Sequence, residues 1–225
     1  SLTRKNFNGL AAYESYAEKP FRFGNFTTMG ELTIETGLNE AQISGYRREL
    51  SLDSARTLVQ FVYDGVRYAR TAFISYPDNV MVLRFKANAK GMQNLCFRYA
   101  PNPVSTGKMQ ADGANGLVYR GALDSNGMQY VVRIQALTHG GTLENSGQTL
   151  TIKGADEVVF LITADTDYRI NFNPDFHNPK TYVGVQPEVT TEKWMQQAAE
   201  RGYAQLFQRH FKDYSPLFER VKLQL

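Results

Sequence analysis

Two runs rich in Val, Phe and Tyr meet at an Asp-Gly pair, and this feature constrains the fold most. The runs lie within TLVQFVYDGVRYARTAFISYP, residues 57–77, and the pair is Asp64-Gly65. An Asp-Gly pair supplies the positive φ angles that a two-residue hairpin turn requires. Valine and aromatic residues favour strands because their side chains pack well on a half-buried pleated surface. The sequence therefore predicts an antiparallel β-hairpin centred on this pair.

Short runs of this type, separated by turn signals, continue from Gly30 to about Thr163, which is typical of an antiparallel sandwich. The run DEVVFLIT, residues 156–163, is almost continuously apolar and predicts a central strand covered on both faces. Beyond the hairpin, we expect strands at Gly30–Thr36, Val80–Asn88, Asn94–Tyr99, Gly116–Leu123, Met128–Leu137, Gln148–Lys153 and Glu157–Thr163.

The pattern changes after Thr163. A long stretch rich in Asn, Asp and Pro shows almost no periodicity and predicts a loop. A helix is expected to follow, capped by Thr190 or Thr191 and ending before Ser215-Pro216, because apolar residues recur there at threes and fours. We therefore predict a mainly β protein, an antiparallel two-sheet super-β-sandwich followed by a short helical linker. Its expected parts are a partial N-terminal segment (1–29), the β-sandwich domain (30–189) and the helical linker (190–225).

Composition excludes several classes of function. The formal net charge of the 225 residues is only +3 and no basic run stands out, which argues against a nucleic-acid partner. No apolar run is long enough to span a bilayer. Cys96 is the only cysteine, so an intramolecular disulfide is impossible, and we expect this thiol to be a small buried hydrophobe rather than a nucleophile. The sequence starts at Ser1 without a Met or a signal peptide, and we expect it to be cut from a longer protein.

The charged segment SGYRRELSLDSA, residues 44–55, is a candidate for a catalytic constellation or an anion site. Glu49 and Asp53 share a face of an extended strand but lie roughly 13 Å apart, which is too far for direct cooperation as acid and base. Alternation places Leu50 and Leu52 on one face and most of the charges on the other. We therefore interpret this segment as the wall of a sheet, with the leucines in a core and the charges on a surface.

The three histidines, His139, His177 and His210, form no metal-binding motif. His210 lies in the apolar stripe of the predicted helix and is expected to be packed or interfacial, whereas His139 belongs to a loop. We predict no metal site, no cofactor and no catalytic residue within this chain. A metal-dependent enzyme would need three or more ligands, and the sequence offers no such set.

The long loop is the candidate binding element. Four of its polar residues could hydrogen-bond sugar hydroxyls, and neighbouring aromatic residues could stack on sugar rings. Two other interpretations stay open: a calcium site that also uses Asp165 and Asp167, and simple turn formation by Asn and Asp. The candidate substrate-binding residues are Asn171, Asn173, Asp175 and His177.

One segment resembles a known family. The stretch from Tyr46 to Ala87 resembles the N-terminal domain of glycoside hydrolase family 95, the α-L-fucosidase family, which carries Tyr-Arg-Arg-x-Leu-x-Leu-Asp-x-Ala and then a hairpin ending in Arg-Glu-x-Phe-x-Ser-x-Pro-Asp-x-Val. The C-terminal HFKDYSPLFERV, residues 210–221, is similar to the end of that family's linker. Thr71 and Ile74 depart from the pattern. The matching positions include Tyr46, Arg47, Arg48, Leu50, Leu52, Asp53, Ala55, Arg70, Phe73, Ser75, Pro77, Asp78, Val80 and Arg84.

This resemblance implies a function for a larger parent protein. Members of the family hydrolyse terminal α-L-fucose, or the related α-L-galactose, with inversion, and their catalytic residues lie in an (α/α)6 barrel that follows the linker and is absent here. We therefore expect a non-catalytic domain whose partners are its own C-terminal catalytic domain and the glycan substrate of the parent, in the periplasm or outside the cell. The alternative is a free-standing carbohydrate-binding or interaction module.

Overall fold

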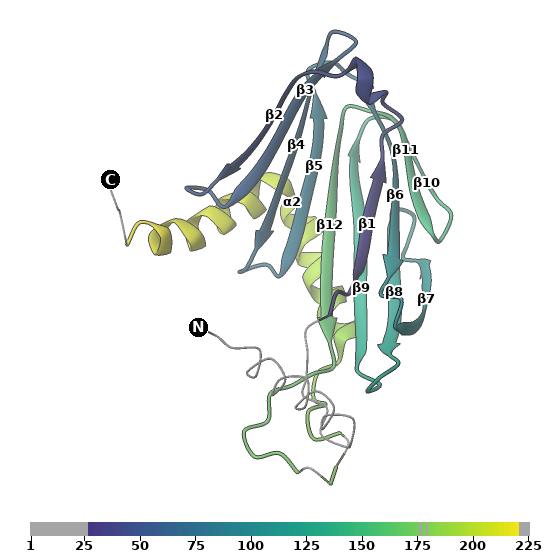
Figure 1. Cartoon of the computed structure of the whole chain (residues 1–225), viewed down its shortest axis with the longest axis vertical. Coiled ribbons are helices and arrows are strands. Elements are labelled where there is room, and N and C mark those ends of the chain that lie inside the picture. The colour runs from purple at the N-terminus through teal and green to yellow at the C-terminus, as the bar shows by residue number, and fades with distance from the viewer. Residues whose placement is uncertain (1–26, 176, 179, 221–225) are drawn as a thin grey trace, which may run out of the picture.

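The computed structural model describes residues 27–175, 177–178 and 180–220 of the chain, and in these it is mainly β. Two antiparallel sheets, one of eight strands and one of four, face each other, and a long C-terminal helix crosses the outer face of the larger sheet (Figure 1). The predicted fold class is therefore confirmed. Within the described part of the chain, no helix has the length and apolar character needed to cross a bilayer.

The strands follow one another in an order that places β12 near the middle of the larger sheet. The larger sheet runs β2 (Ser44–Ser51), β3 (Arg56–Tyr63), β4 (Val66–Ser75), β5 (Val80–Ala87), β12 (Glu157–Thr166), β9 (Gln129–His139), β8 (Gly116–Leu123) and β7 (Ser105–Ala111). The smaller sheet runs β1 (Gly30–Glu35), β6 (Gln93–Pro101), β11 (Thr149–Ala155) and β10 (Thr142–Asn145), and a 3-10 helix, η1 (Glu40–Gln42), links it to β2.

The predicted hairpin is confirmed. Tyr63 pairs with Val66, and Asp64 and Gly65 between them have φ angles of 48° and 72°. The strands β7 and β10 were missed by the sequence analysis. β7 is a polar edge strand that contains glycine, and β10 has only four residues, so both depend on pairing with their neighbours rather than on local propensity.

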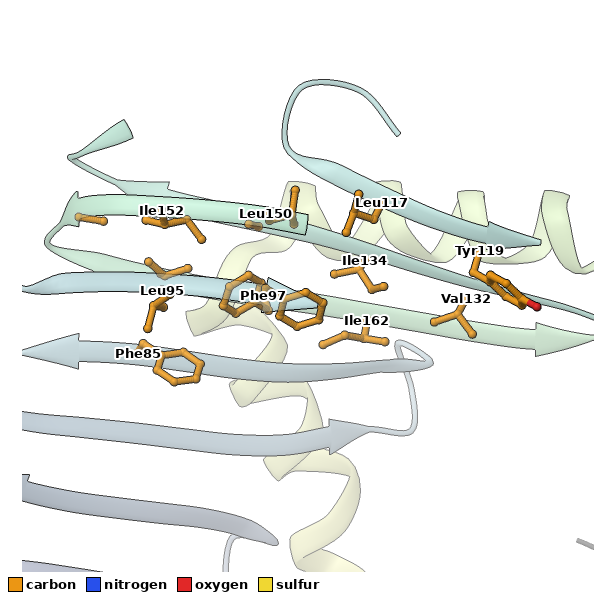
Figure 2. Close-up of a cluster of buried hydrophobic side chains, with 14 of the residues drawn as sticks. Phe85, Leu95, Phe97, Leu117, Tyr119, Val132, Ile134, Leu150, Ile152 and Ile162 are labelled. Carbon is orange, nitrogen blue, oxygen red and sulfur yellow. The ribbon is translucent and has the colours of Figure 1, made fainter. Parts of the chain in front are cut away.

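The core between the sheets comes from the inward positions of both. Figure 2 shows Leu95 and Phe97 of β6 among side chains of the larger sheet such as Phe85 and Ile162. The ring of Phe97 stacks on that of Phe160 with their centroids 4.6 Å apart, and both side chains are fully buried. Cys96, which points the other way on β6, is only half-buried, so the expectation of a buried thiol was wrong.

The apolar strand β12 is covered on both faces, as predicted. Its residue Phe160 faces the smaller sheet, and its residues Val159 and Leu161 pack against the helix α2 (Pro187–Phe218). On the helix, Met195 and Leu206 are buried in this second core. Burial of a large apolar side chain stabilises a fold by about 1.5–3 kcal/mol, so α2 is an integral part of the sandwich.

The bounds of the helix differ from those predicted. The helix starts at Pro187, because proline has no N–H to lose and is favoured in a first helical turn. Thr191 is not a cap: it is buried, and its hydroxyl donates to the carbonyl of Pro187 at 2.7 Å. Gly202, with φ 65° and ψ 176°, kinks the helix, which then continues through Pro216 to Phe218. Pro216 lies in the last turn, so only Leu217 and Phe218 of the helix follow its missing N–H.

The first turn of α2 is held by an ion-pair cluster on the larger sheet. Glu188 accepts two hydrogen bonds from Arg120, at 2.6 and 2.7 Å, and a third from Arg133. Arg133, whose side chain is almost completely buried, also donates to Asp112. The hydrogen bonds from Arg120, and then the nearby positive charges, hold the pKa of Glu188 below its ordinary value of 4.5.

We expect Glu188→Gln to lower the free energy of unfolding at pH 7 by about 1–3 kcal/mol, because one buried arginine nitrogen loses its charged acceptor. Since the folded-state pKa of Glu188 is lowered, its stabilisation is present above pH 4.5 and is lost as the pH falls through the folded value. Urea unfolding between pH 3 and 7 should therefore show a difference from the wild type that shrinks in acid. The control is Glu200→Gln, an exposed position on the same helix. An equal, pH-independent loss in both variants would contradict this account.

Candidate interaction surface

The four loop residues proposed to bind substrate lie between β12 and α2, at the lower end of the molecule in Figure 1. Asn171 donates to the carbonyl of Thr181 at 3.0 Å, and its side-chain oxygen accepts the N–H of Asn173. The carboxylate of Asp175 accepts the N–H of His177 at 3.0 Å. Two of the four side chains therefore form local turns, whereas those of Asn173 and His177 are exposed. Their role in binding substrate stays a prediction.

The acidic residues next to this loop have structural partners. Asp167 is buried, and its carboxylate accepts the N–H of Gln129 at 3.1 Å. Asp165 accepts the N–H of Thr166. In the part of the chain that the structure covers, no three His, Cys, Asp or Glu side chains are placed to hold a metal ion.

The other end of the molecule brings together two of the segments that carry the family resemblance. His210 of α2 is buried, and its Nε2 lies 3.0 Å from the carbonyl oxygen of Ser54 and 3.2 Å from that of Ala55. Carbonyl oxygens only accept, so Nε2 carries the proton and donates to them. The His210 ring also stacks on Phe73, with centroids 5.0 Å apart. The expectation that His210 is packed is confirmed.

A buried carboxylate ties the β4–β5 turn to the same helix. The side chain of Asp78 is fully buried, and it accepts hydrogen bonds from Ser75 at 2.6 Å and from Arg209 at 2.8 Å. Arg201 approaches the same carboxylate oxygen to 3.1 Å. The Ser-x-Pro-Asp motif of this turn is therefore a structural anchor for α2.

The leucines of the charged segment are not in a core, which corrects the prediction. Leu50 and Leu52 are about 60% exposed, and Tyr46 is exposed to the same extent. Leu50 pairs with Thr57, on the side of the larger sheet that faces the smaller one. The smaller sheet packs on β5, β12, β9 and β8 and does not cover the end of β2–β4 that carries Leu50 and Ile74. The alternation of side chains along this strand was predicted correctly. However, none of the described residues covers the face that carries the two leucines.

The charged side of this segment behaves as predicted. Arg47 and Glu49 form an exposed ion pair at 2.7 Å, and Asp53 is exposed in the β2–β3 turn. Such pairs contribute little to stability. The segment forms a wall of the larger sheet, and the carboxylate of Glu49 is paired with Arg47.

An apolar groove opens where β2 and β4 end and β3 and β5 begin, beside the C-terminal half of α2. Its volume is about 450 Å³, and its floor includes Phe73 and Met81. Exposed apolar side chains surround it: Leu50 and Ile74 are each 62% exposed and Tyr76 is 80% exposed. Contiguous exposed apolar side chains mark interaction sites in soluble proteins. We call the side chains of Leu50, Ile74 and Tyr76, together with Tyr214 of α2, all of which line the groove, the apolar face.

Comparisons with known proteins show a solved structure with this fold and the family to which the chain belongs. A putative kojibiose phosphorylase from the human microbiome shares it, with a TM-score of 0.55 over 82% of this chain and 27% of that protein, at 10% sequence identity. Residues 3–171 match the family described as "Glycosyl hydrolase family 65, N-terminal domain". The chain belongs to this family of glycoside hydrolase N-terminal domains.

Two curated relatives carry fucosidase names. The "Probable alpha-fucosidase A" of Aspergillus niger is 30% identical over 218 residues, which cover 92% of this chain and 26% of the relative. The "Alpha-L-fucosidase 2" of Arabidopsis thaliana is 24% identical over 226 residues, 89% of this chain and 26% of the relative. The chain thus spans about a quarter of the length of these relatives. The predicted resemblance to the N-terminal domain of a glycoside hydrolase is confirmed, whereas the family model that matches is numbered 65 and the predicted family 95 stays a prediction.

We expect Asp78→Asn to lower the free energy of unfolding by about 1–3 kcal/mol, because the amide loses the negative charge that pairs with Arg209 and Arg201. Asp53→Asn, in the exposed β2–β3 turn, is the matched control and should change it by less than about 0.5 kcal/mol. Urea unfolding followed by the fluorescence of Trp194, the only tryptophan and a residue of α2, measures both. Equal effects of the two substitutions would contradict an anchoring role for Asp78.

Proposed function

We propose that this chain is the non-catalytic N-terminal domain of a larger fucosidase-type glycoside hydrolase of family 95. In this proposal, the parent removes terminal α-L-fucose or α-L-galactose with inversion, in the periplasm or outside the cell. The domain packs against the C-terminal catalytic domain of the same polypeptide and shapes one side of its cleft. The names of the two curated relatives, and the quarter of their length that the chain spans, support this view.

The apolar face is the observation that carries the proposal. It lies beside the C-terminal half of α2, so the chain leaves the sandwich next to the surface that needs cover (Figure 1). In the last two turns of the helix, Phe211, Leu217 and Phe218 are exposed as well. A domain that follows α2 would bury these side chains without a long connection, and this makes it the favoured occupant of the apolar face.

The acidic residues of the sandwich support a non-catalytic role. The pKa values of Glu157 and Glu188 are both lowered, and each carboxylate accepts a pair of hydrogen bonds from an arginine: Glu157 from Arg84 at 2.9 and 2.7 Å, and Glu188 from Arg120. A general acid needs the opposite, a raised pKa that keeps its proton at working pH. These two carboxylates are structural.

The chain alone should not hydrolyse a chromogenic α-L-fucoside, whereas the product of the whole reading frame that contains it should. The control is the whole product with a neutral β-glucoside. Turnover by the isolated chain that survives re-purification would overturn the non-catalytic role. Specific binding of the isolated chain to a glycan array, together with a stop codon directly after the codon for Leu225, would favour the free-standing module instead.

The double substitution Leu50→Ser and Ile74→Ser tests the docking. In the isolated chain it should leave the midpoint of thermal unfolding unchanged, because both side chains are already exposed. In the whole product the midpoint should fall and fucoside turnover should weaken, since each apolar side chain buried at an interface contributes about 1.5–3 kcal/mol. Val104→Ser with Val189→Ser, exposed positions outside the apolar face, should have no effect in either. An unchanged whole product would exclude docking at this face.

A further inference from the structure

A second hollow lies between the two sheets at the upper end of the molecule in Figure 1. Its volume is about 210 Å³, below the roughly 300–1,000 Å³ of pockets that take drug-sized ligands. The β3–β4 turn, the loop after β1 and the start of β6 surround it. The lining residues that matter most are Asp64, Tyr68, Arg70, Phe85 and Gln93.

Gln93 contributes a buried donor that lacks an acceptor. It is the first residue of β6, faces inward and is only 3% exposed. Within the described residues, its Nε2 atom has no hydrogen-bond partner. A buried amide without a partner costs about 1–3 kcal/mol, so an acceptor supplied by a ligand would recover this loss.

Arg70 contributes a half-buried cation to the same hollow. Its guanidinium lies over two rings, 5.0 Å from the centroid of Phe61 and 5.7 Å from that of Phe85. Burial lowers the pKa of Arg70, and the nearby Tyr46 opposes this shift. The ring faces attract the charge but offer only weak acceptors to the N–H groups. An anionic oxygen group is the partner that such a guanidinium favours.

The remaining lining suits a hydroxylated ring. Tyr68 lines the hollow beside Arg70 and is held by stacking on Phe61, with centroids 5.2 Å apart; we call the rings of Tyr68 and Phe85 in the lining the aromatic wall. Asp64 is exposed at the rim, where its carboxylate can accept hydrogen bonds from hydroxyl groups. Lys86, also at the rim, is already engaged by Glu157 at 3.6 Å. The carboxylate of Asp64, the amide of Gln93, the guanidinium of Arg70 and the ring of Tyr68 are therefore gathered around one small hollow.

We propose that this hollow binds a sugar acid, a single pyranose ring that carries a carboxylate, as in a uronic acid. The carboxylate of the sugar acid lies against Arg70 and accepts a hydrogen bond from the Gln93 amide. The sugar hydroxyls face Asp64, and the C–H side of the sugar ring lies on the aromatic wall. This site is separate from the apolar face and does not depend on the proposed docking. Binding to the isolated chain can therefore fail or succeed independently of the parent's hydrolytic activity.

Calorimetric titration of the isolated chain with glucuronate and galacturonate tests the proposal. Glucose and galactose control for the ring without the charge, and acetate controls for the charge without the ring. We expect a dissociation constant of about 1 mM or tighter for at least one uronate, and binding at least about tenfold weaker for all three controls. The side-chain amide signals of Gln93 should shift during the titration. Equal binding of acetate, or no saturation by either uronate, would show that the hollow holds only a simple anion or water, and would overturn the proposal.

Variants assign the binding to these residues. Arg70→Met keeps the packing on the rings and should weaken uronate binding at least about tenfold, and Arg70→Lys, which keeps the charge but loses the fork, should weaken it less. Gln93→Leu should weaken binding without lowering the midpoint of thermal unfolding, because it removes an unpartnered buried amide. Arg98→Met, on the outer face of the smaller sheet, is the matched control and should bind normally. Unchanged binding in Arg70→Met and Arg70→Lys would overturn the assignment.

Discussion

The larger sheet has twice as many strands as the sheet that covers it, and most other features of the molecule depend on this mismatch. Apolar strands need cover on both faces. The smaller sheet covers one face of β5, β12, β9 and β8, and α2 crosses the other face of the larger sheet. The inner face of β2–β4 is left open at the end that carries Leu50 and Ile74, both of which are exposed. The apolar face therefore follows directly from the relative widths of the two sheets.

Polar contacts at both ends of α2 determine where the chain leaves the sandwich. Glu188 holds the first turn to Arg120 and Arg133, and beyond the kink at Gly202 the helix is held through Asp78 and through His210. Apolar packing alone is non-directional, whereas hydrogen bonds between buried groups require one geometry. The Ser-x-Pro-Asp turn that contains Asp78 and the C-terminal motif that contains His210 are far apart in the sequence. Both position the helix that leads out of the domain.

Local chemistry was enough to predict much of the fold. The Asp64-Gly65 hairpin, the central strand β12 and a C-terminal helix follow from turn geometry, continuous apolar character and periodicity. The bounds of the helix were less predictable, because the start at Pro187 and the kink at Gly202 depend on the sheet beneath. Neither the groove beside α2 nor the hollow between the two sheets was predicted. Arg70 and Gln93 are distant in sequence, and only the opposition of β4 and β6 brings them to one cavity.

By itself, the sequence determined the fold class, the alternation of each strand and the family, because all three depend on residue order within short segments. The tertiary structure decided which alternating faces are buried. Leu50 shows the difference: its parity matches that of a core residue, but the smaller sheet ends before reaching it. Burial depends on what lies opposite a strand, and that is a property of the assembled sheets rather than of the strand.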